Sequence, residues 1–341
     1  MRTLIVGVGA LGGVIGARLL NAGAEVFLAT RDEAAAHRLR TSGLRVSGVG
    51  GEISIPRLTT VASLDAYRAA SASFDLVLLA TKAQDAIELA PCLVDLLSET
   101  GVLLPIQNGT VSRLLDERIP GGRVLAGLSN LGATMVSPGT YEQRNAGDLL
   151  IGELGGGVSA RAERVREWLA RGIDVHISDN MTGAIWSKLL LNCSVTTLGA
   201  IAGVTMREYI TAYVDVFMET YGEALSVALA GDVRPERMLV DPIPPGWTGR
   251  VPRDAAVESW LKRILENYGD VKPSMLQDFE RGRTSEIDFI NGYVVDRGKA
   301  LGIPTPVNAA IVETVRAITR REIAPHLDLL ERLIERARAA L

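Results

Sequence analysis

Short runs of apolar residues alternate with helical patterns along the first part of the chain. Thr3–Val6 and Ala24–Ala29 are two such runs, and Asp75–Thr81 and Gly101–Ile106 follow further along. Continuous apolar runs of this length are typical of strands that are buried on both faces, as in parallel sheets. Strands that alternate with helices over about 150 residues predict an α/β domain with a doubly wound parallel sheet.

Two further segments are expected to add strands to this domain. Residues 41–56 contain short β-like pieces separated by glycines, which predicts a hairpin. Residues 173–177 also have the pattern of a strand, and we expect this strand to join the first sheet.

The second part of the chain has a different character, because long helical patterns follow one another from residue 160 onward. They cover 160–171, 180–204, 206–229, 254–267, 273–301 and 306–340. A chain of 341 residues is too long for one ordinary core, so two domains are expected. We place an α/β domain at residues 1–179 and an all-α domain at residues 180–341.

Composition and charge narrow the range of partners. The chain is 47% hydrophobic and 22% charged, which suits a globular protein, and its formal net charge is −4. There is no basic footprint, so neither a nucleic acid nor an anionic membrane is expected as a partner. Cys92 and Cys193 are far apart and are expected to be reduced, buried thiols.

The location that these features indicate is the cytoplasm. The chain runs from Met1 directly into a strand that the fold needs, so we expect no cleavable signal. No uninterrupted apolar stretch approaches the ~18–20 residues of a membrane span. The long apolar helices of the second part are compatible with a homodimer.

Three glycines follow the first strand in a G-x-G-x-x-G pattern. Gly7 permits a tight turn, Gly9 lets the backbone approach a pyrophosphate, and Gly12 lets helix and strand pack closely. Ala10 and Leu11 then begin a helix whose free N–H groups can bind phosphates. Because the motif lies between a strand and a helix, it predicts a dinucleotide site; the alternative is a glycine-rich turn without a ligand.

The end of the second strand bears on the choice of nicotinamide nucleotide. A site for NAD has an acidic residue here to bind the ribose 2′-hydroxyl, whereas this chain has Thr30-Arg31 followed by Asp32. Arg31 can pair with a 2′-phosphate, and Thr30 can add a hydroxyl. The sequence therefore favours NADP(H), although Arg31 could also be an ordinary surface arginine.

Reduction of a carbonyl needs a proton donor as well as a hydride. The three histidines His37, His176 and His326 are scattered, which gives neither a convincing acid nor a metal site. Lys188 and Asn192 are four residues apart and share one helix face within an apolar segment. Spacing alone leaves two interpretations of Lys188: its ammonium group reaches solvent, or it lies partnered in a cleft.

A second polar segment covers residues 272–292. Ser274 and Glu286 could bind a polar substrate, and Glu286 could be a counter-charge for Lys188. The alternative is that the acidic residues form a solvated face and that Ser274 caps a helix.

With these segments the chain resembles the ketopantoate reductase family, and the resemblance runs from residue 1 to about residue 320. The resemblance rests on the glycine loop and on four motifs, which are Thr81-Lys82-Ala83, Gln107-Asn108-Gly109, Trp186-x-Lys188-x-x-x-Asn192, and Ser274-Met275-Leu276-Gln277-Asp278 with Glu286 through Gly292. It implies an N-terminal Rossmann-type domain and an all-α domain like the C-terminal domain of 6-phosphogluconate dehydrogenase. It also implies reduction of 2-dehydropantoate (ketopantoate) to pantoate with NADPH, in the route to pantothenate.

The resemblance further implies roles for single residues. Lys188 matches the general acid and Glu286 the carboxylate that orients lysine and substrate. Asn192 and Ser274 match substrate-binding residues. Lys82 and Asn108 match positions near the nicotinamide, and Arg31 matches the contact to the 2′-phosphate. A small-molecule carbonyl compound, such as a 2-oxo acid, is the expected substrate, and no metal is expected.

The chain departs from the family's pattern at two polar positions. Thr196 and Val271 stand where known members tend to have asparagine. The Pro/Gly-rich segment 239–253, with Trp247, also looks long and could cover the substrate cleft as an apolar wall. Two alternatives to ketopantoate reduction therefore remain open: a relative that reduces another 2-oxo acid, ketone or imine, and a non-catalytic nucleotide-binding protein.

Overall fold

The computed structural model describes residues 1–339, and the chain divides into two compact units, Met1–Met181 and Thr182–Leu341. The first unit is the α/β part and the second is the helical part, and each is described by itself.

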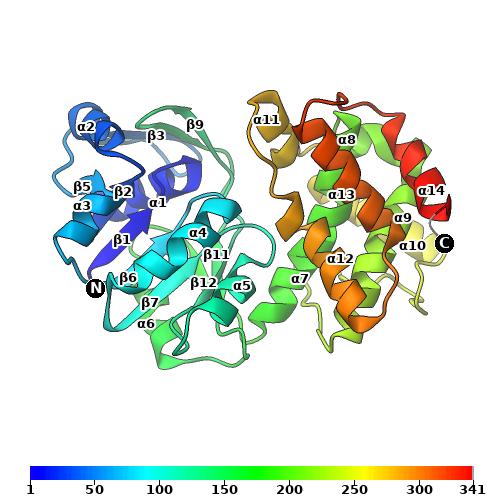
Figure 1. Ribbon diagram of the computed structural model, residues 1–341, viewed down its shortest axis with the longest axis horizontal. Helices are drawn as coiled ribbons and strands as arrows, with labels where there is room; N and C mark the ends of the chain where they lie inside the picture. Colours follow the sequence, from blue (N-terminus) through cyan, green and yellow to red (C-terminus); the bar gives the residue numbers. More distant parts are fainter. Residues whose placement is uncertain (340–341) are drawn as a thin grey trace. The chain divides into compact units, whose positions relative to one another are not determined.

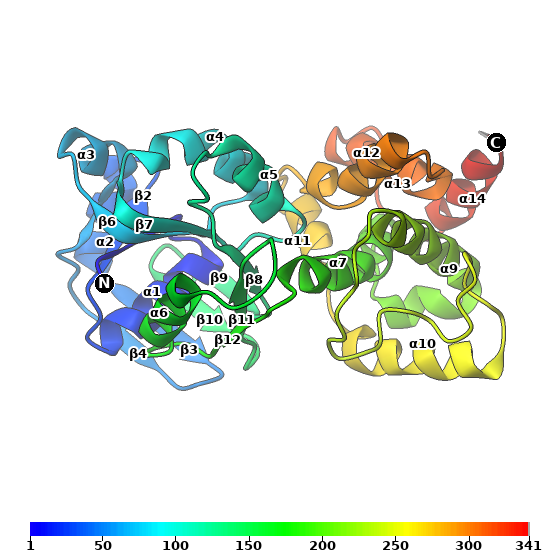
Figure 2. The same cartoon turned by 90° about the horizontal axis from the view of Figure 1, so that it is seen from below.

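A five-stranded parallel sheet forms the centre of the first unit (Figure 1). Its spatial order is β5 (Val61–Ser63), β2 (Val26–Thr30), β1 (Thr3–Val6), β6 (Phe74–Leu79) and β7 (Leu97–Pro105). Counted along the chain this order is 3-2-1-4-5, that of a Rossmann-type domain. Figure 2 shows α4 (Ala83–Val94) and α5 (Val111–Arg118) on one face and α1 (Ala10–Asn21) and α6 (Ala160–Leu169) on the other. The predicted doubly wound sheet is confirmed.

Helices on both faces explain why the strands are so apolar. Leu4, Ile5, Leu28 and Leu78 have no exposed surface at all, because side chains on either side of the sheet are covered. Two more helices, α2 (Glu33–Ser42) and α3 (Leu64–Ala69), pack against β2 and β5 at the β5 edge of the sheet.

A second, four-stranded sheet packs against α1. Its order is β4 (Ile53–Ile55), β3 (Leu44–Gly48), β10 (Thr140–Gln143) and β9 (Ala133–Ser137). The pairing of β3 with β4 is antiparallel, so the hairpin predicted in residues 41–56 is confirmed. The sequence patterns gave no indication of β9 and β10, because these strands are short and only partly apolar.

The strand predicted at 173–177 requires a correction. It is observed as β12 (Val175–Ile177), and it pairs with β11 (Leu149–Gly152) rather than with a strand of the parallel sheet. β11 pairs in turn with β8 (Ala126–Ser129) to give a three-stranded sheet. Backbone hydrogen bonds on both sides of Leu103 in β7 join the parallel sheet to the residues that lead into β8.

The regular elements of the second unit are all helices within the described residues, and they surround one apolar core (Figure 1). Its first helical stretch consists of α7 (Met181–Leu191), a π-helical turn (Asn192–Thr196) and α8 (Thr197–Ala202). The remaining helices are α9 (Met206–Ala230), α10 (Ala255–Tyr268), α11 (Ser274–Glu280), α12 (Asn291–Leu301), α13 (Pro306–Thr319) and α14 (Leu329–Ala339), with a short 3-10 turn at Ile287–Phe289.

The long helix predicted over 273–301 was wrong, because α11 ends at Glu280. Gly282 has a φ of +62° there. The N–H of Gly282 donates to the carbonyl of Phe279, and the N–H of Arg283 donates to that of Asp278. This pattern of bonds with a left-handed glycine ends a helix. The helix predicted over 306–340 is likewise interrupted, between Thr319 and Leu329.

Residues Met181–Ala202 are, by length and composition, apolar enough to cross a membrane, with a mean hydropathy of 1.3. However, 83% of that stretch is buried inside the protein. Its apolar character is explained by its position in the core of the helical unit.

The Pro/Gly-rich segment 239–253 is attached to the core of the helical unit. The hydroxyl of Tyr221 donates to the carbonyl of Pro242 at 2.7 Å, and the indole N–H of Trp260 donates to that of Asp241 at 2.7 Å. Trp247 packs against this core beside Gly222. Trp247 therefore contributes to core packing in this unit, and its suggested part in the wall of a substrate cleft stays a prediction.

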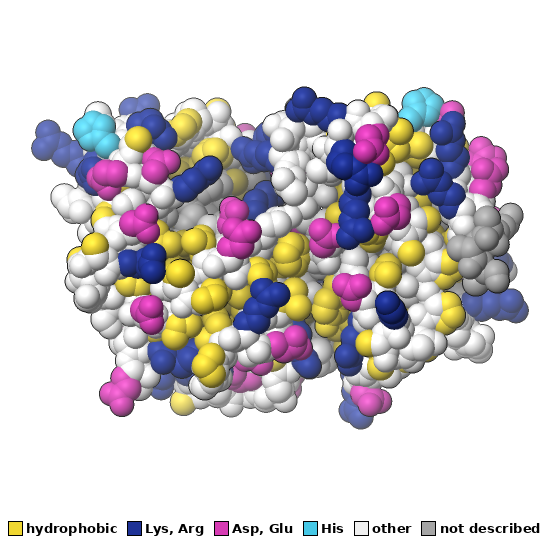
Figure 3. Space-filling model, in the orientation of Figure 1, with side chains coloured by type: hydrophobic (Ala, Val, Ile, Leu, Met, Phe, Trp, Pro, Cys, Tyr) yellow, Lys and Arg dark blue, Asp and Glu magenta, His cyan; other side chains and the backbone are white. Residues whose placement is uncertain are grey.

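Basic and acidic side chains are interspersed on the face of each unit that Figure 3 presents. Several pairs lie one helical turn apart, as Arg113 and Glu117 do at 2.9 Å. Exposed pairs of this kind contribute little to stability.

Candidate active site

The glycine loop occupies the turn between β1 and α1, and each of its glycines has a distinct reason. Gly7 has a φ of +95°, and a Cβ there would lie 2.8 Å from the backbone nitrogen of Thr81. A Cβ on Gly12 would lie 2.0 Å from the carbonyl oxygen of Gly7. A Cβ on Gly9, by contrast, meets no described atom within 4 Å. Two glycines are therefore needed for the fold, and the third leaves open space beside the backbone.

The open space lies at the start of a helix. Gly9 is the N-cap of α1 and has no side chain to cap it, and its carbonyl accepts the first helical hydrogen bond from Gly13. The N–H groups of Gly9, Ala10, Leu11 and Gly12 precede that bond, so helix α1 cannot satisfy them itself. Unsatisfied N–H groups beside open backbone form a binding position for a phosphate. These residues fit the pyrophosphate of a dinucleotide.

Two further strands, β6 and β7, end at the same edge of the sheet as the glycine loop. Lys82 follows β6 as the N-cap of α4, and Asn108 follows β7; both side chains are half-buried. Gln107 links the two strand ends, because its amide donates to the carbonyls of Leu79 and Thr81. In open α/β sheets a ligand binds at this carboxyl edge, where the chain reverses direction between the first strand and the fourth.

Several buried polar atoms at this edge have no hydrogen-bond partner within residues 1–339. They are the side-chain oxygens of Thr81, Gln107 and Thr110. Buried polar groups are almost always paired, so a group of unpaired ones beside the glycine loop is consistent with a site that a ligand or water completes.

At the end of β2 the structure separates the roles of three adjacent residues. Arg31 is exposed, whereas Asp32 is the N-cap of α2 and accepts a hydrogen bond from the N–H of Ala35 at 2.7 Å. Thr30 is buried, and its hydroxyl donates to the carbonyl of Asp32, so the expectation that Thr30 offers a hydroxyl to the cofactor is corrected. The carboxylate that could have bound a ribose already caps a helix, and Arg31 remains exposed beside it.

In the helical unit, Lys188 and Asn192 lie on one side of the first helical stretch. Both are half-buried, while Leu189 and Leu190 next to them have no exposed surface. The amide nitrogen of Asn192 is buried and has no hydrogen-bond partner within the described residues. A buried donor without a partner costs about 1–3 kcal/mol, which a ligand oxygen could recover.

Asn192 also begins the π-helical turn, and its backbone carbonyl accepts hydrogen bonds from two side chains. The hydroxyls of Thr196 and Thr197 each donate to it at 2.9 Å. The hydroxyl proton of Thr196, at a position where the family tends to have asparagine, is thus engaged with the backbone. π-turns inside α-helices occur often at functional sites.

A buried polar network is hydrogen-bonded to this turn through the carbonyl of Cys193. The amide of Asn291 donates to the carbonyl of Cys193 at 3.3 Å and to the side-chain oxygen of Asn308 at 2.9 Å. The amide of Asn308 in turn donates to the carboxylate of Glu223 at 2.8 Å, and this carboxylate also accepts from the backbone N–H groups of Val307 and Asn308. Burial raises the pKa of Glu223, and these hydrogen bonds oppose that shift.

Sequence reasoning missed Glu223 and Asn308 and noted Asn291 only as part of a motif. The one available signal was a set of polar residues within apolar helix faces. Such residues point to a buried network, but their sequence does not show which of them meet.

The other two predicted residues lie on separate elements. Ser274 is exposed at the first position of α11, and Pro273 rather than Ser274 is the N-cap, so the alternative of a capping serine is wrong. Glu286 is half-buried, directly before the 3-10 turn that packs on α12 and α13. α11 itself packs on α8.

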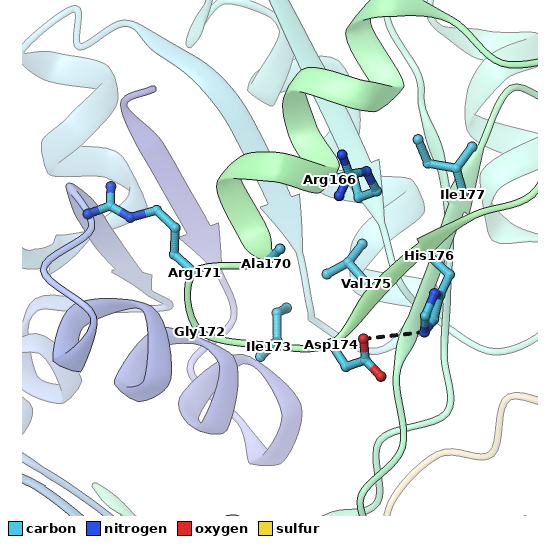
Figure 4. Close-up of a pocket in the computed structure, with 9 residues that line it drawn as sticks. All are labelled: Arg166, Ala170, Arg171, Gly172, Ile173, Asp174, Val175, His176 and Ile177. Carbon is cyan, nitrogen blue, oxygen red and sulfur yellow. Dashed lines mark ion pairs between the residues drawn. The ribbon is translucent and has the colours of Figure 1, made fainter.

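A pocket of about 720 Å³ lies elsewhere in the first unit (Figure 4). It is lined by Arg166 and by residues 170–177, and it includes none of the predicted site residues. Figure 4 shows Arg171 pointing away from His176, and His176 pairs with Asp174 at 3.3 Å. Arg171 and His176 therefore do not converge on a common binding position.

Within the described residues, no group of three or more His, Cys, Asp or Glu side chains could hold a metal ion. Both cysteines are free thiols, as expected. Cys193 is buried, but Cys92 is only half-buried, which corrects one detail of the prediction.

A Rossmann-type sheet with a glycine turn at its first strand, followed by a helical unit, is typical of pyridine-nucleotide-dependent oxidoreductases, and the comparisons place the chain in this class. The chain belongs to the ketopantoate reductase family. The family model "Ketopantoate reductase PanE/ApbA" matches residues 3–156, and the model of its C-terminal domain matches residues 180–319. The predicted family, fold class and enzyme class are confirmed.

Individual relatives agree with this assignment. The chain is 28% identical over 327 residues to a 2-dehydropantoate 2-reductase of Pyrococcus horikoshii, covering 93% of this chain and 97% of that protein. A PanE/ApbA family ketopantoate reductase of Ralstonia eutropha is similar in structure, with a TM-score of 0.78 and 28% identity over 94% of this chain and 99% of the other. D-mandelate dehydrogenase, solved with NADH and anilino(oxo)acetate, shares the fold at a TM-score of 0.77 and 23% identity over 94% and 99%.

Proposed function

We propose that the protein reduces 2-dehydropantoate to pantoate with NADPH and that Lys188 is its general acid. The observation that supports this most strongly is the half-buried Lys188 in an otherwise apolar helix, one turn before the unpaired amide of Asn192. A buried amide without a partner is costly, so its position one turn from a half-buried ammonium group supports a polar ligand at this place.

A bound nicotinamide would supply the hydride to the carbonyl carbon. The carbonyl oxygen then takes a proton from the ammonium group of Lys188, which leaves the lysine neutral until solvent returns the proton. The positive charge of Lys188 also stabilises the negative charge that develops on that oxygen. Asn192 and Ser274 bind the substrate, Glu286 orients Lys188 and the substrate, and Lys82 and Asn108 line the nicotinamide position.

The preference for NADP(H) over NAD(H) rests on the end of β2. Asp32 already accepts the hydrogen bond that caps α2, and the adjacent Arg31 is exposed and suited to a 2′-phosphate. We also place the protein in the cytoplasm, in the route to pantothenate, and a homodimer remains a prediction.

A second candidate is reduction of another 2-oxo acid, ketone or imine by the same residues. Two observations favour it: Thr196 has its hydroxyl proton on a backbone carbonyl, and Val271 presents an apolar side chain that is 47% exposed. Neither offers the amide that the family pattern has at that position. A shared fold does not fix the substrate, as the similarity to D-mandelate dehydrogenase illustrates.

The direct test is the rate of NADPH oxidation with ketopantoate and with a panel of 2-oxo acids and ketones of increasing size. We expect the highest kcat/KM for ketopantoate. Turnover of a bulkier carbonyl compound without turnover of ketopantoate would replace the first proposal by the second. No turnover of any carbonyl compound, with NADPH still bound, would leave a nucleotide-binding protein without this activity.

The nucleotide preference has its own test, with two arginines of the same region as a matched pair. Arg31→Ala should weaken NADPH binding by roughly 10- to 100-fold and NADH binding by much less, because a charge-assisted pair to the 2′-phosphate is lost. Arg38→Ala, an exposed arginine of α2, is the control and should change neither. Equal losses for both nucleotides in Arg31→Ala would contradict the role of Arg31.

A further inference from the structure

A tyrosine from the four-stranded sheet lies against the glycine loop. Tyr141 is in β10, far from the loop in sequence, and has no exposed surface. Its ring lies directly over Gly13 of α1, where a Cβ would come within 2.2 Å of a ring carbon. Its hydroxyl donates to the carbonyl of Val8 at 3.1 Å.

Val8 is the residue between the first two glycines of the loop, so this hydrogen bond acts on a particular peptide group. The carbonyl of Val8 and the N–H of Gly9 belong to one planar peptide, and this peptide is trans, since residues 1–339 contain no cis peptide bond. In a trans peptide these two groups point in opposite directions. A hydroxyl that fixes the carbonyl of Val8 therefore also fixes the direction of the N–H of Gly9, away from Tyr141.

The same sheet holds α1 at a second point. The guanidinium group of Arg18 donates to the side chain of Gln143 in β10 at 2.7 Å and to the carbonyl of Val49 at 2.8 Å. Helix α1 is thus attached to this sheet both near its N-terminus, through Tyr141, and near its C-terminus, through Arg18. The ring of Tyr141 and the contacts of Arg18 fix the position of the helix. The additional effect of the Tyr141 hydroxyl is to fix the orientation of the loop peptide.

We propose that Tyr141 is a positioning residue for the dinucleotide, whose hydroxyl presets the amide of Gly9 toward the pyrophosphate. This inference rests on the proposed binding of NADPH at the glycine loop. An amide that is oriented before binding need not be ordered by the ligand, and preorganisation of this kind increases affinity. Burial also raises the pKa of Tyr141 to about 12, so its hydroxyl remains protonated and able to donate at neutral pH.

The test uses Tyr141→Phe, which removes one oxygen and keeps the ring over Gly13, so the fold should be retained. Two ligands are titrated: NADPH, and adenosine 2′-monophosphate, which lacks the pyrophosphate. We expect Tyr141→Phe to bind NADPH about 5- to 20-fold more weakly, the effect of one hydrogen bond. Its affinity for adenosine 2′-monophosphate and its kcat at saturating NADPH should stay within a factor of about two.

The matched control is Tyr221→Phe, which removes an equally buried hydroxyl that donates to the carbonyl of Pro242 in the helical unit. It should leave both affinities unchanged. Normal NADPH affinity in Tyr141→Phe, or an equal loss for both ligands, would overturn the inference and leave the proposed function in place. If the unmodified protein bound neither NADPH nor NADH, the proposed function would fail, and this inference with it.

Discussion

The two units contribute candidate binding groups of different kinds. At the glycine loop the candidate groups are backbone N–H groups, and the glycines matter because they have no side chain. In the helical unit the candidate groups are the side chains of Lys188 in α7 and of Asn192, which begins a π-turn that a buried network contacts. The glycine loop depends on the path of the backbone, and the helical unit on the identity of a few side chains.

This difference predicts opposite responses to alanine. In the helical unit, alanine should remove the proposed reacting group and leave the fold in place. At the glycine loop, alanine adds an atom, so the effect depends on the space around each position.

The largest expected effect is that of Lys188→Ala. Loss of the positioned acid should lower kcat by roughly 10²–10⁴, with NADPH affinity retained. Stopped-flow reduction and NADPH titration measure the two separately. Lys262→Ala, an exposed lysine of α10, is the control and should keep full activity.

Lys188→Arg separates the two contributions of the lysine. Arginine keeps the positive charge but does not release a proton near neutral pH, so kcat should remain low. Turnover close to normal in Lys188→Ala would remove Lys188 from the mechanism.

The next effect distinguishes two glycines of the same loop. Gly12→Ala places a Cβ 2.0 Å from a carbonyl oxygen and should lower the free energy of unfolding by about 1–3 kcal/mol. Gly9→Ala places its Cβ in open space and should cost less than about 1 kcal/mol, yet weaken NADPH binding about tenfold or more, because the backbone can no longer approach the pyrophosphate.

Urea denaturation and NADPH titration of both variants provide the comparison. A Gly9→Ala protein with normal NADPH affinity would show that the dinucleotide does not lie against this backbone.

The smallest effect concerns alkaline pH. Burial raises the pKa of Tyr141 from its ordinary value of 10.0 to about 12. A raised pKa in the folded state stabilises the protein below pH 10, and this contribution is lost as the pH rises from 10 through 12. The free energy of unfolding should therefore fall over that window, and it should fall less steeply in Tyr141→Phe, by on the order of 1 kcal/mol. Equal slopes in the two proteins would contradict this assignment.

The same difference explains how much could be predicted from the sequence. The parallel sheet and the glycine loop could be predicted, because continuous apolar strands and a glycine between a strand and a helix follow from local backbone geometry. The hairpin at residues 41–56 could be predicted for the same reason.

The parts that escaped prediction depend on contacts between distant residues. β9, β10 and Tyr141 meet α1 only after the chain has passed through most of the first unit. The network of Glu223, Asn291 and Asn308 joins three helices, and no spacing reveals it. The break after Glu280 had a local signal in Gly282, which the apolar periodicity on either side obscured. Lys188 itself was distinguished from a solvent-directed lysine only by resemblance to a family.

The π-turn also sets where this chain can change in length. Each residue of an α-helix turns the chain by about 100°, so deletion of one residue inside α7 or α8 would rotate the helix beyond it by that angle. A π-turn closes its hydrogen bonds over one residue more than an α-helical turn, so deletion of one residue from Asn192–Thr196 can be absorbed by conversion of the turn to α-helix. The fully buried Leu198 and Ile201 would then keep their contacts with the core. A single-residue deletion should therefore be tolerated better inside the π-turn than in the helices on either side of it.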